Sequence, residues 1–137
     1  MSVITVSPDV NLHGDALLAY QQYIESGGRV IDYHKDIEFD ADVIVDGLLG
    51  TGLGREVTGL YAHAVAAINQ NNSPVLSLDI PSGPHADSGC VMGCAVKADC
   101  TISFIGLKQG LFTGQAADDC GAIYFSSLAV PDQIGRA

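Results

Sequence analysis

Two aspartates come at the ends of short apolar runs, where side chains of an α/β protein often do chemistry. Asp46 closes the run 42–46, and Asp79 lies near the end of the run 75–80. In a parallel sheet, ligands bind in the crevice beyond the carboxyl ends of the strands. We therefore predict that Asp46 and Asp79 belong to one binding or catalytic site.

A glycine-rich loop follows Asp46 and contains Gly50-Thr51-Gly52-Leu53-Gly54. Its backbone amides can approach a phosphate, because glycine carries no side chain to obstruct the approach. The loop is not a P-loop, since no Gly-Lys-Ser/Thr follows it. A second interpretation stays open, in which the loop is only a turn that leads into the next helix.

The second aspartate stands in the run Asp79-Ile80-Pro81-Ser82-Gly83. A carboxylate beside a proline-fixed turn is held rigidly, as a general acid or base requires, although Asp79 could instead cap the turn. The spacing of a serine nucleophile is absent around Ser82, which argues against a serine hydrolase. The Ser82 hydroxyl could instead bind a hard cation together with Asp46.

One cation is a further candidate for this site. Lys108 follows the predicted strand 101–105 and could reach the same crevice to meet a phosphate, or it could be an ordinary surface lysine. The four histidines are scattered without a helical pair, so zinc is not indicated. The four cysteines lack a paired metal spacing, and we interpret them as reduced thiols.

Alternating strands and helices are predicted to position these residues. Hydrophobic periodicity and glycine or proline stops predict helices at 15–25 and about 60–68, and strands at 3–6, 29–33, 42–46, 75–80, 98–105 and 123–127. This alternation favours a parallel sheet with right-handed crossovers, an α/β fold. The run 42–46 is nearly all β-branched between its acids, a pattern typical of a parallel strand buried on both faces.

Composition narrows the class of protein. The chain has 137 residues, enough for one domain, and we predict a single domain over 1–137. Its formal charge of −10 would repel nucleic acid and anionic membranes. No apolar run reaches the roughly 20 residues of a membrane span, and the start is unlike a secretory signal. We expect a soluble, cytoplasmic protein.

Three motifs together resemble those of the NAD(P)H-hydrate epimerase family, the YjeF N-terminal domain. They occur in the family's order and spacing, and the resemblance runs over about residues 3–131. The motifs are Val45-Asp46-Gly47-Leu48-Leu49-Gly50-Thr51-Gly52-Leu53, then Leu78-Asp79-Ile80-Pro81-Ser82-Gly83 with Ala86-Asp87-Ser88-Gly89, then Lys108-Gln109-Gly110-Leu111 with Thr113-Gly114.

The resemblance implies a Rossmann-like three-layer α/β/α fold with a mostly parallel sheet. It also implies interconversion of the R and S forms of hydrated NADH or NADPH (NADHX and NADPHX), which carry a hydroxyl at nicotinamide C6. By resemblance, Asp46 and Ser82 hold one potassium ion per subunit, and Asp79 contacts the substrate. Our own hypothesis is that Asp79 shuttles the proton to the departing or arriving oxygen. Lys108 is then an electrostatic partner of the phosphates or of Asp79. The residues implied in binding substrate phosphates are Gly50, Thr51, Gly52, Leu53, Gly54, Arg55 and Glu56.

One departure from the family pattern is large. Family members begin with a helical segment and a first strand that ends in an Asn-Asn-Gly-Gly-Asp-Gly-like phosphate loop, and nothing in this sequence matches that element. We therefore expect a domain incomplete at its N-terminus, with exposed strand edges that favour a homo-oligomer. A fused ADP- or ATP-dependent dehydratase is an expected partner. The alternative function is a non-catalytic ligand-binding or protein-interaction scaffold on the same fold.

Overall fold

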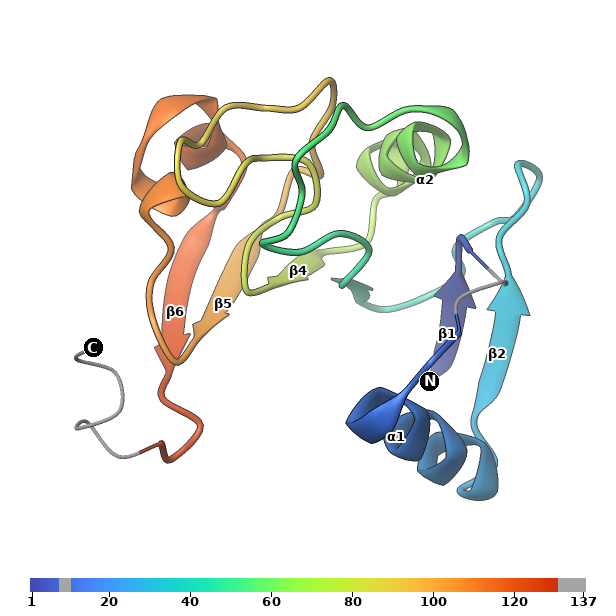
Figure 1. Cartoon of the computed structure of the whole chain (residues 1–137). Helices are drawn as coiled ribbons and strands as arrows, with labels where there is room; N and C mark the ends of the chain where they lie inside the picture. Colours follow the sequence, from blue (N-terminus) through green and yellow to red (C-terminus); the bar gives the residue numbers. More distant parts are fainter. Residues whose placement is uncertain (8–10, 131–137) are drawn as a thin grey trace. The chain divides into compact units, whose positions relative to one another are not determined.

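The computed structural model describes residues 1–7 and 11–130 of the chain. These fall into two compact units, Met1–Ile37 and Glu38–Ala137, and each is described by itself (Figure 1). The prediction of one domain over 1–137 stays a prediction. Neither α-helix in the described ranges has the length and hydrophobicity that a membrane span requires.

The first unit is a single strand-helix-strand crossover. Strand β1 (Ser2–Thr5) pairs in parallel with β2 (Arg29–Asp32), and helix α1 (Gly14–Glu25) connects them. The helix ends where Gly27 takes a positive φ of 86°, a conformation that glycine adopts without strain. The predicted helix and both predicted strands of this unit are confirmed, with shifts of one residue at their ends.

The second unit contains a four-stranded sheet in which every strand pair is parallel. Its strand order follows the sequence: β3 (Ile44–Asp46), β4 (Val75–Leu78), β5 (Cys100–Phe104) and β6 (Ala122–Ser126). Helix α2 (Gly59–Gln70) connects β3 to β4. The predicted α/β class with a parallel sheet is confirmed, and the carboxyl ends of β3 and β4 lie side by side (Figure 1).

Two apolar clusters hold this unit together. The first joins α2 to the sheet and contains Val57, Val65, Ile68, Val75 and Val96. The second contains Ile80, Ala86, Leu111 and Cys120. Leu111 belongs to the short 3₁₀ helix η1 (Gln109–Phe112), which is followed by η2 (Gly114–Asp118). Sequence periodicity did not predict these helices, because each is a single turn or little more.

The expectation that strand 42–46 is buried on both faces is wrong. Val45 is 53% exposed and Val43 is 51% exposed, whereas Asp46 is 2% exposed. The buried cluster beside α2 includes Val75 and takes in Ile44, which lies on the same face as Asp46. In the described part of this unit, α2 therefore covers one face of β3, and Val45 points to the other face.

Candidate functional site

The Asp46 carboxylate is a buried centre of hydrogen bonds at the end of β3. Its Oδ2 accepts from the Ser77 hydroxyl at 2.8 Å and from the Ser82 backbone N–H at 2.9 Å. Its Oδ1 accepts from the Ser82 hydroxyl at 2.6 Å and from the Leu48 N–H at 3.2 Å. A carboxylate offers about four lone-pair sites, so these four donors occupy all of them. Asp46 thereby ties β3 to β4 and to the loop after β4.

Ser82 connects this centre to the glycine-rich loop. Its Oγ donates to Asp46 and accepts a hydrogen bond from the Leu49 N–H at 2.8 Å. The Leu49 carbonyl oxygen also lies 3.2 Å from Ser82 Oγ. Three oxygens from Asp46, Ser82 and Leu49 thus lie together, and oxygen donors of this kind suit a hard monovalent cation. The side chains that the family resemblance assigns to a potassium ion therefore lie together, and an ion bound there would replace some of the hydrogen bonds that Asp46 accepts.

The loop after Ser82 keeps that serine in place. Gly83 has a positive φ of 124°, and a Cβ at this position would clash with the Cys94 carbonyl oxygen. The Ser82 carbonyl accepts a hydrogen bond from the Val96 N–H at 2.8 Å. Any side chain at position 83 would therefore push the Ser82 turn away from residues 94–96.

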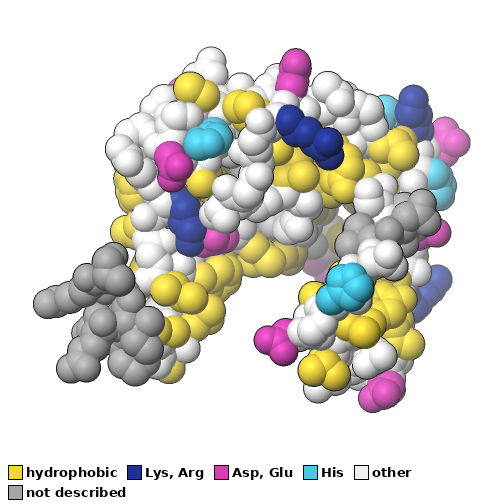
Figure 2. Space-filling view, viewed as in Figure 1, with side chains coloured by type: hydrophobic (Ala, Val, Ile, Leu, Met, Phe, Trp, Pro, Cys, Tyr) yellow, Lys and Arg dark blue, Asp and Glu magenta, His cyan; other side chains and the backbone are white. Residues whose placement is uncertain are grey.

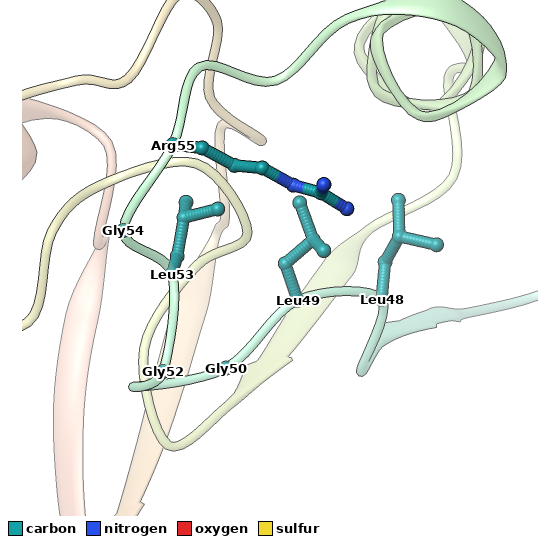
Figure 3. A pocket seen from close by; sticks show the side chains of 7 residues that line it. All are labelled: Leu48, Leu49, Gly50, Gly52, Leu53, Gly54 and Arg55. Atoms are coloured by element: carbon teal, nitrogen blue, oxygen red, sulfur yellow. The ribbon is translucent and has the colours of Figure 1, made fainter.

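The glycine-rich loop lines an open pocket of about 480 Å³ (Figure 3). A Cβ added at Gly50, Gly52 or Gly54 would meet no atom within 4 Å, so the backbone is open to an approaching ligand. In Figure 3, the Arg55 side chain extends past Leu49 toward Leu48 and brings a cation to the pocket. A pocket with accessible backbone and a guanidinium is suited to an anionic group such as a phosphate.

Not every loop residue expected to bind substrate lines this pocket. Gly50, Gly52, Leu53, Gly54 and Arg55 do, and so do Leu48 and Leu49, which the sequence reasoning did not select. Thr51 is exposed but does not line it. Glu56 also lies outside the lining and is close to Gly93 instead.

Asp79 lies one residue beyond β4 and has an unusual backbone conformation. Its φ is 70°, which is uncommon for a residue other than glycine and is often found at functional sites. Its N–H donates to the Ile102 carbonyl at 2.7 Å, which fixes the strained position against β5. The side chain is 29% exposed, so the carboxylate remains accessible to a ligand.

The two oxygens of the Asp79 carboxylate have different surroundings. Oδ1 accepts from the Ser103 hydroxyl at 3.2 Å, from the Phe104 N–H at 3.1 Å and from the Lys108 ammonium. Among residues 1–7 and 11–130, no donor makes a hydrogen bond to Oδ2. One oxygen is therefore anchored to protein, and the other is available for proton transfer with a bound molecule.

The structure places Lys108 against Asp79, one of the two positions that the sequence left open. Its Nζ also donates to the carbonyl oxygens of Phe104 and Gly106, each at 2.9 Å. An ammonium has three N–H donors, so these contacts occupy all of them. Ile105, between the two carbonyls, has a φ of 63°, a strained conformation for a β-branched residue. This strained turn aims both carbonyls at the ammonium.

The four cysteines are free thiols, and the pKa values of two of them are raised. Burial, with a smaller contribution from the Asp119 charge, raises the pKa of Cys120 to about 11. Burial and the nearby Glu56 carboxylate raise the pKa of Cys94. Both thiols therefore stay protonated at neutral pH.

Comparisons with known proteins agree on one family. Residues 1–110 match the family model described as YjeF-related protein N-terminus. A bifunctional NAD(P)H-hydrate repair enzyme of Vibrio cholerae is 42% identical over 125 residues, which are 91% of this chain and 25% of the relative. An NAD(P)H-hydrate epimerase of Limosilactobacillus fermentum is 43% identical over 70% of this chain and 44% of the relative.

A eukaryotic relative shows the same pattern. The bifunctional NAD(P)H-hydrate repair enzyme of Leishmania major is 47% identical over 68% of this chain and 17% of its own length. The chain therefore spans about a quarter of the length of the bifunctional relative from Vibrio cholerae, and less than half of the length of the other two.

Proposed function

Because the chain belongs to the family of YjeF-related protein N-termini, we propose that it interconverts the R and S epimers of hydrated NADH and NADPH. The observation that carries this proposal is the Asp79 carboxylate, which has one anchored oxygen and one accessible oxygen. Relatives named NAD(P)H-hydrate epimerase and NAD(P)H-hydrate repair enzyme support the choice of substrate. This is an isomerase activity in the repair of damaged nicotinamide cofactors.

In this proposal, the glycine-rich loop binds the phosphates of the substrate. Gly50 and Gly52 expose backbone, and Arg55 adds the positive charge of the pocket. The open backbone at Gly54 extends the same surface, with Thr51, Leu53 and Glu56 completing the implied segment. Binding the phosphates here leaves the nicotinamide ring free to reach Asp79.

The proposed chemistry moves one proton and one water molecule at C6. The lone pair of ring nitrogen N1 forms a C6=N1 double bond while the C6–O bond breaks. Protonated Asp79 gives its proton to the departing oxygen, which leaves as water, and an iminium cation remains. Water then adds to the opposite face of C6 and the electron pair returns to N1. The proton that this water releases passes through solvent to Asp79 Oδ2. Asp79 ends protonated, as it began, and the configuration at C6 is inverted.

Lys108 has an electrostatic role in this scheme. In this scheme, Asp79 is an anion while the iminium cation exists. The Lys108 ammonium, which contacts Asp79 Oδ1, lies beside that anion. A fixed positive charge beside the carboxylate stabilises the anion without movement of the protein. Lys108 is therefore proposed as the charge partner of Asp79, and the phosphates are left to the glycine-rich loop.

A potassium ion is a further part of the proposal. Asp46 and Ser82 would hold it, and when bound it would supply a positive charge next to the phosphate-binding loop. A ligand that binds only the folded state raises the melting temperature. We expect potassium chloride to raise the melting temperature of the wild type more than sodium chloride does, and we expect Ser82→Ala to remove the difference. Equal melting in both salts would contradict a potassium site.

The wider assembly is proposed on similar grounds. A fused dehydratase partner agrees with the word "bifunctional" in the names of the longer relatives. Hydrophobic side chains gather where β5 and β6 end (Figure 2), and Ile105, Leu107, Phe125 and Leu128 of that region are more than half exposed. An exposed apolar patch is suited to self-association. A homo-oligomer in the cytoplasm is the proposed form, and a monomer in size-exclusion chromatography at every concentration would contradict the oligomer.

The function is tested with the purified R epimer of hydrated NADH. We expect the chain to convert it to a mixture with the S epimer, resolved by chromatography, faster than buffer alone. The bifunctional enzyme of Vibrio cholerae serves as the positive control. In water enriched in oxygen-18, each inversion should place one labelled oxygen at C6. Conversion without the label would reject hydroxyl loss, and no conversion beside an active control would favour the scaffold alternative.

A further inference from the structure

Ser103 is a buried hydroxyl that neither the sequence motifs nor the family resemblance selects. It lies on β5 and its exposed fraction is 0%. Its Oγ is 3.2 Å from Asp79 Oδ1 and 3.3 Å from the Gly106 carbonyl oxygen. A hydroxyl has one proton to donate, so it can serve either acceptor in turn.

The same two acceptors are shared with Lys108. The ammonium contacts Asp79 Oδ1 and donates to the Gly106 carbonyl at 2.9 Å. Ser103 and Lys108 therefore form a ring of polar groups with Asp79 and Gly106, in which the Ser103 proton bonds to one of the two acceptors at a time. The Phe104 N–H, next to Ser103 on the strand, adds a bond from the rigid backbone to Asp79 Oδ1.

This ring keeps its groups paired in both charge states of Asp79. While Asp79 is an anion, Oδ1 is a strong acceptor and the Ser103 proton is drawn to it. When a proton is on Oδ2, Oδ1 is a weaker acceptor, and the Ser103 proton can turn to the Gly106 carbonyl. A buried polar group without a partner is costly, so a hydroxyl with two acceptors suits a residue whose neighbour changes charge.

We propose that Ser103 is a positioning residue for Asp79, which it holds by Oδ1 so that Oδ2 faces the substrate. The proposal rests on the proposed function, because it assigns the orientation of the acid that this function uses. Ser103 itself does not touch the reacting atoms. Its hydroxyl acts through the carboxylate and sets the angle at which the carboxylate meets the C6 oxygen.

The first test is amide hydrogen exchange, which needs no activity. The Phe104 N–H donates to Asp79, whereas the next amide, that of Ile105, donates to the Ser126 carbonyl at 2.9 Å. In Ser103→Ala, we expect exchange at Phe104 to become about tenfold faster while exchange at Ile105 changes by less than about twofold. Unchanged exchange at Phe104 would overturn the proposal, because Ser103 would then have no effect on Asp79. An equal loss of protection from exchange at both amides would also overturn it, because Ser103 would then be merely structural.

The second test is a comparison of kinetic constants with matched variants. Ser103→Ala should lower kcat about tenfold and leave KM within about twofold, because misplacing the acid affects the chemical step. Ser103→Thr keeps the hydroxyl and should restore most of kcat. Thr101→Val is the control, since it removes another buried hydroxyl of β5, bonded to the Cys120 carbonyl at 2.8 Å, without touching Asp79. Equal losses in the alanine and threonine variants would contradict the positioning role.

Failure of the positioning role is distinguishable from failure of the function. If the wild type does not interconvert the epimers, the proposed function fails, and hydrogen exchange still decides whether Ser103 holds Asp79. If the wild type is active and Ser103→Cys, which keeps the size but weakens the donor, is as active as wild type, only the role of Ser103 fails.

Discussion

Asp46 and Asp79 follow neighbouring parallel strands, yet their carboxylates lie in opposite environments. Asp46 is buried, and donors from two serines and a backbone amide occupy both of its oxygens. Asp79 is partly exposed, and the protein donors all converge on one of its oxygens. The backbone differs as well, because Asp79 has a positive φ.

The difference shows how one local pattern yields two kinds of site. A carboxylate whose lone pairs are all used stabilises the loops around it and has little freedom to exchange a proton. A carboxylate with one free oxygen and an adjacent ammonium can accept and return a proton while its position stays fixed. Asp46 is therefore expected to matter most for folding, and Asp79 for turnover.

The largest expected effect is on turnover in Asp79→Asn. An amide cannot shuttle a proton, so kcat should fall about 10³-fold, within the range usual for loss of a general acid or base. The carbonyl oxygen of the introduced amide can still accept the Phe104 N–H, so the free energy of unfolding should change by no more than about 1 kcal/mol. Kinetics and urea denaturation of the same sample measure both. Retained turnover would remove Asp79 from its role.

The next largest effect is on stability in Asp46→Ala. The change leaves the Ser77 hydroxyl and the Ser82 N–H and hydroxyl without their acceptor in a buried place. We expect the free energy of unfolding to fall by roughly 3 kcal/mol in urea denaturation. Asp42→Ala, at an exposed acid just before β3, is the control and should be nearly neutral. If Asp46→Ala left the free energy of unfolding unchanged, the proposed difference between the two aspartates would be wrong.

A smaller effect on turnover is expected from Lys108→Met. The variant removes the positive charge at Asp79 Oδ1 and should reduce kcat roughly tenfold to a hundredfold, with the fold retained. Lys97→Met removes an exposed cation that is outside this site and should leave kcat unchanged. Steady-state kinetics measure kcat and KM of both variants. A rise in KM alone would indicate that Lys108 serves the phosphates after all.

The smallest expected effect is on the chemical reactivity of the cysteine thiols. At pH 8 the exposed Cys90 should react with iodoacetamide first, whereas Cys120, whose pKa is raised to about 11, should stay unmodified in the folded protein. Its unfolded thiol ionises near pH 9, so the stability that depends on the neutral Cys120 is lost as pH rises from 9 to 11. Peptide mass spectrometry at each pH measures the modification, and early labelling of Cys120 would contradict its burial.

Much of this site could be predicted from sequence, because strand ends and loops leave local signals. Apolar runs predicted the strand that ends at Asp46, and the parallel arrangement implied that Ser82 could meet Asp46. The contacts of Ser103 and Leu49 were not predictable in this way. They join residues that are 24 and 33 positions apart, and nothing in the local sequence specifies such pairs.

The exposed side of β3 was missed for a different physical reason. The apolar run at 42–46 signals that its side chains favour burial, but not which element covers each face. In the described second unit, one face of the strand packs beside α2 and the other leaves Val45 exposed. Hydrophobic pattern therefore predicted the strand correctly and its burial wrongly.

The most direct test of this account compares Asp79→Asn and Asp46→Asn in one experiment. Both variants are brought to the same folded concentration, and the rate of interconversion of the NADHX epimers is measured with the wild type at saturating potassium and substrate. We predict that Asp79→Asn loses turnover about 10³-fold, and that the folded fraction of Asp46→Asn retains at least about a tenth of wild-type turnover. Equal losses in both variants, or wild-type turnover in Asp79→Asn, would contradict the division of roles between the two aspartates.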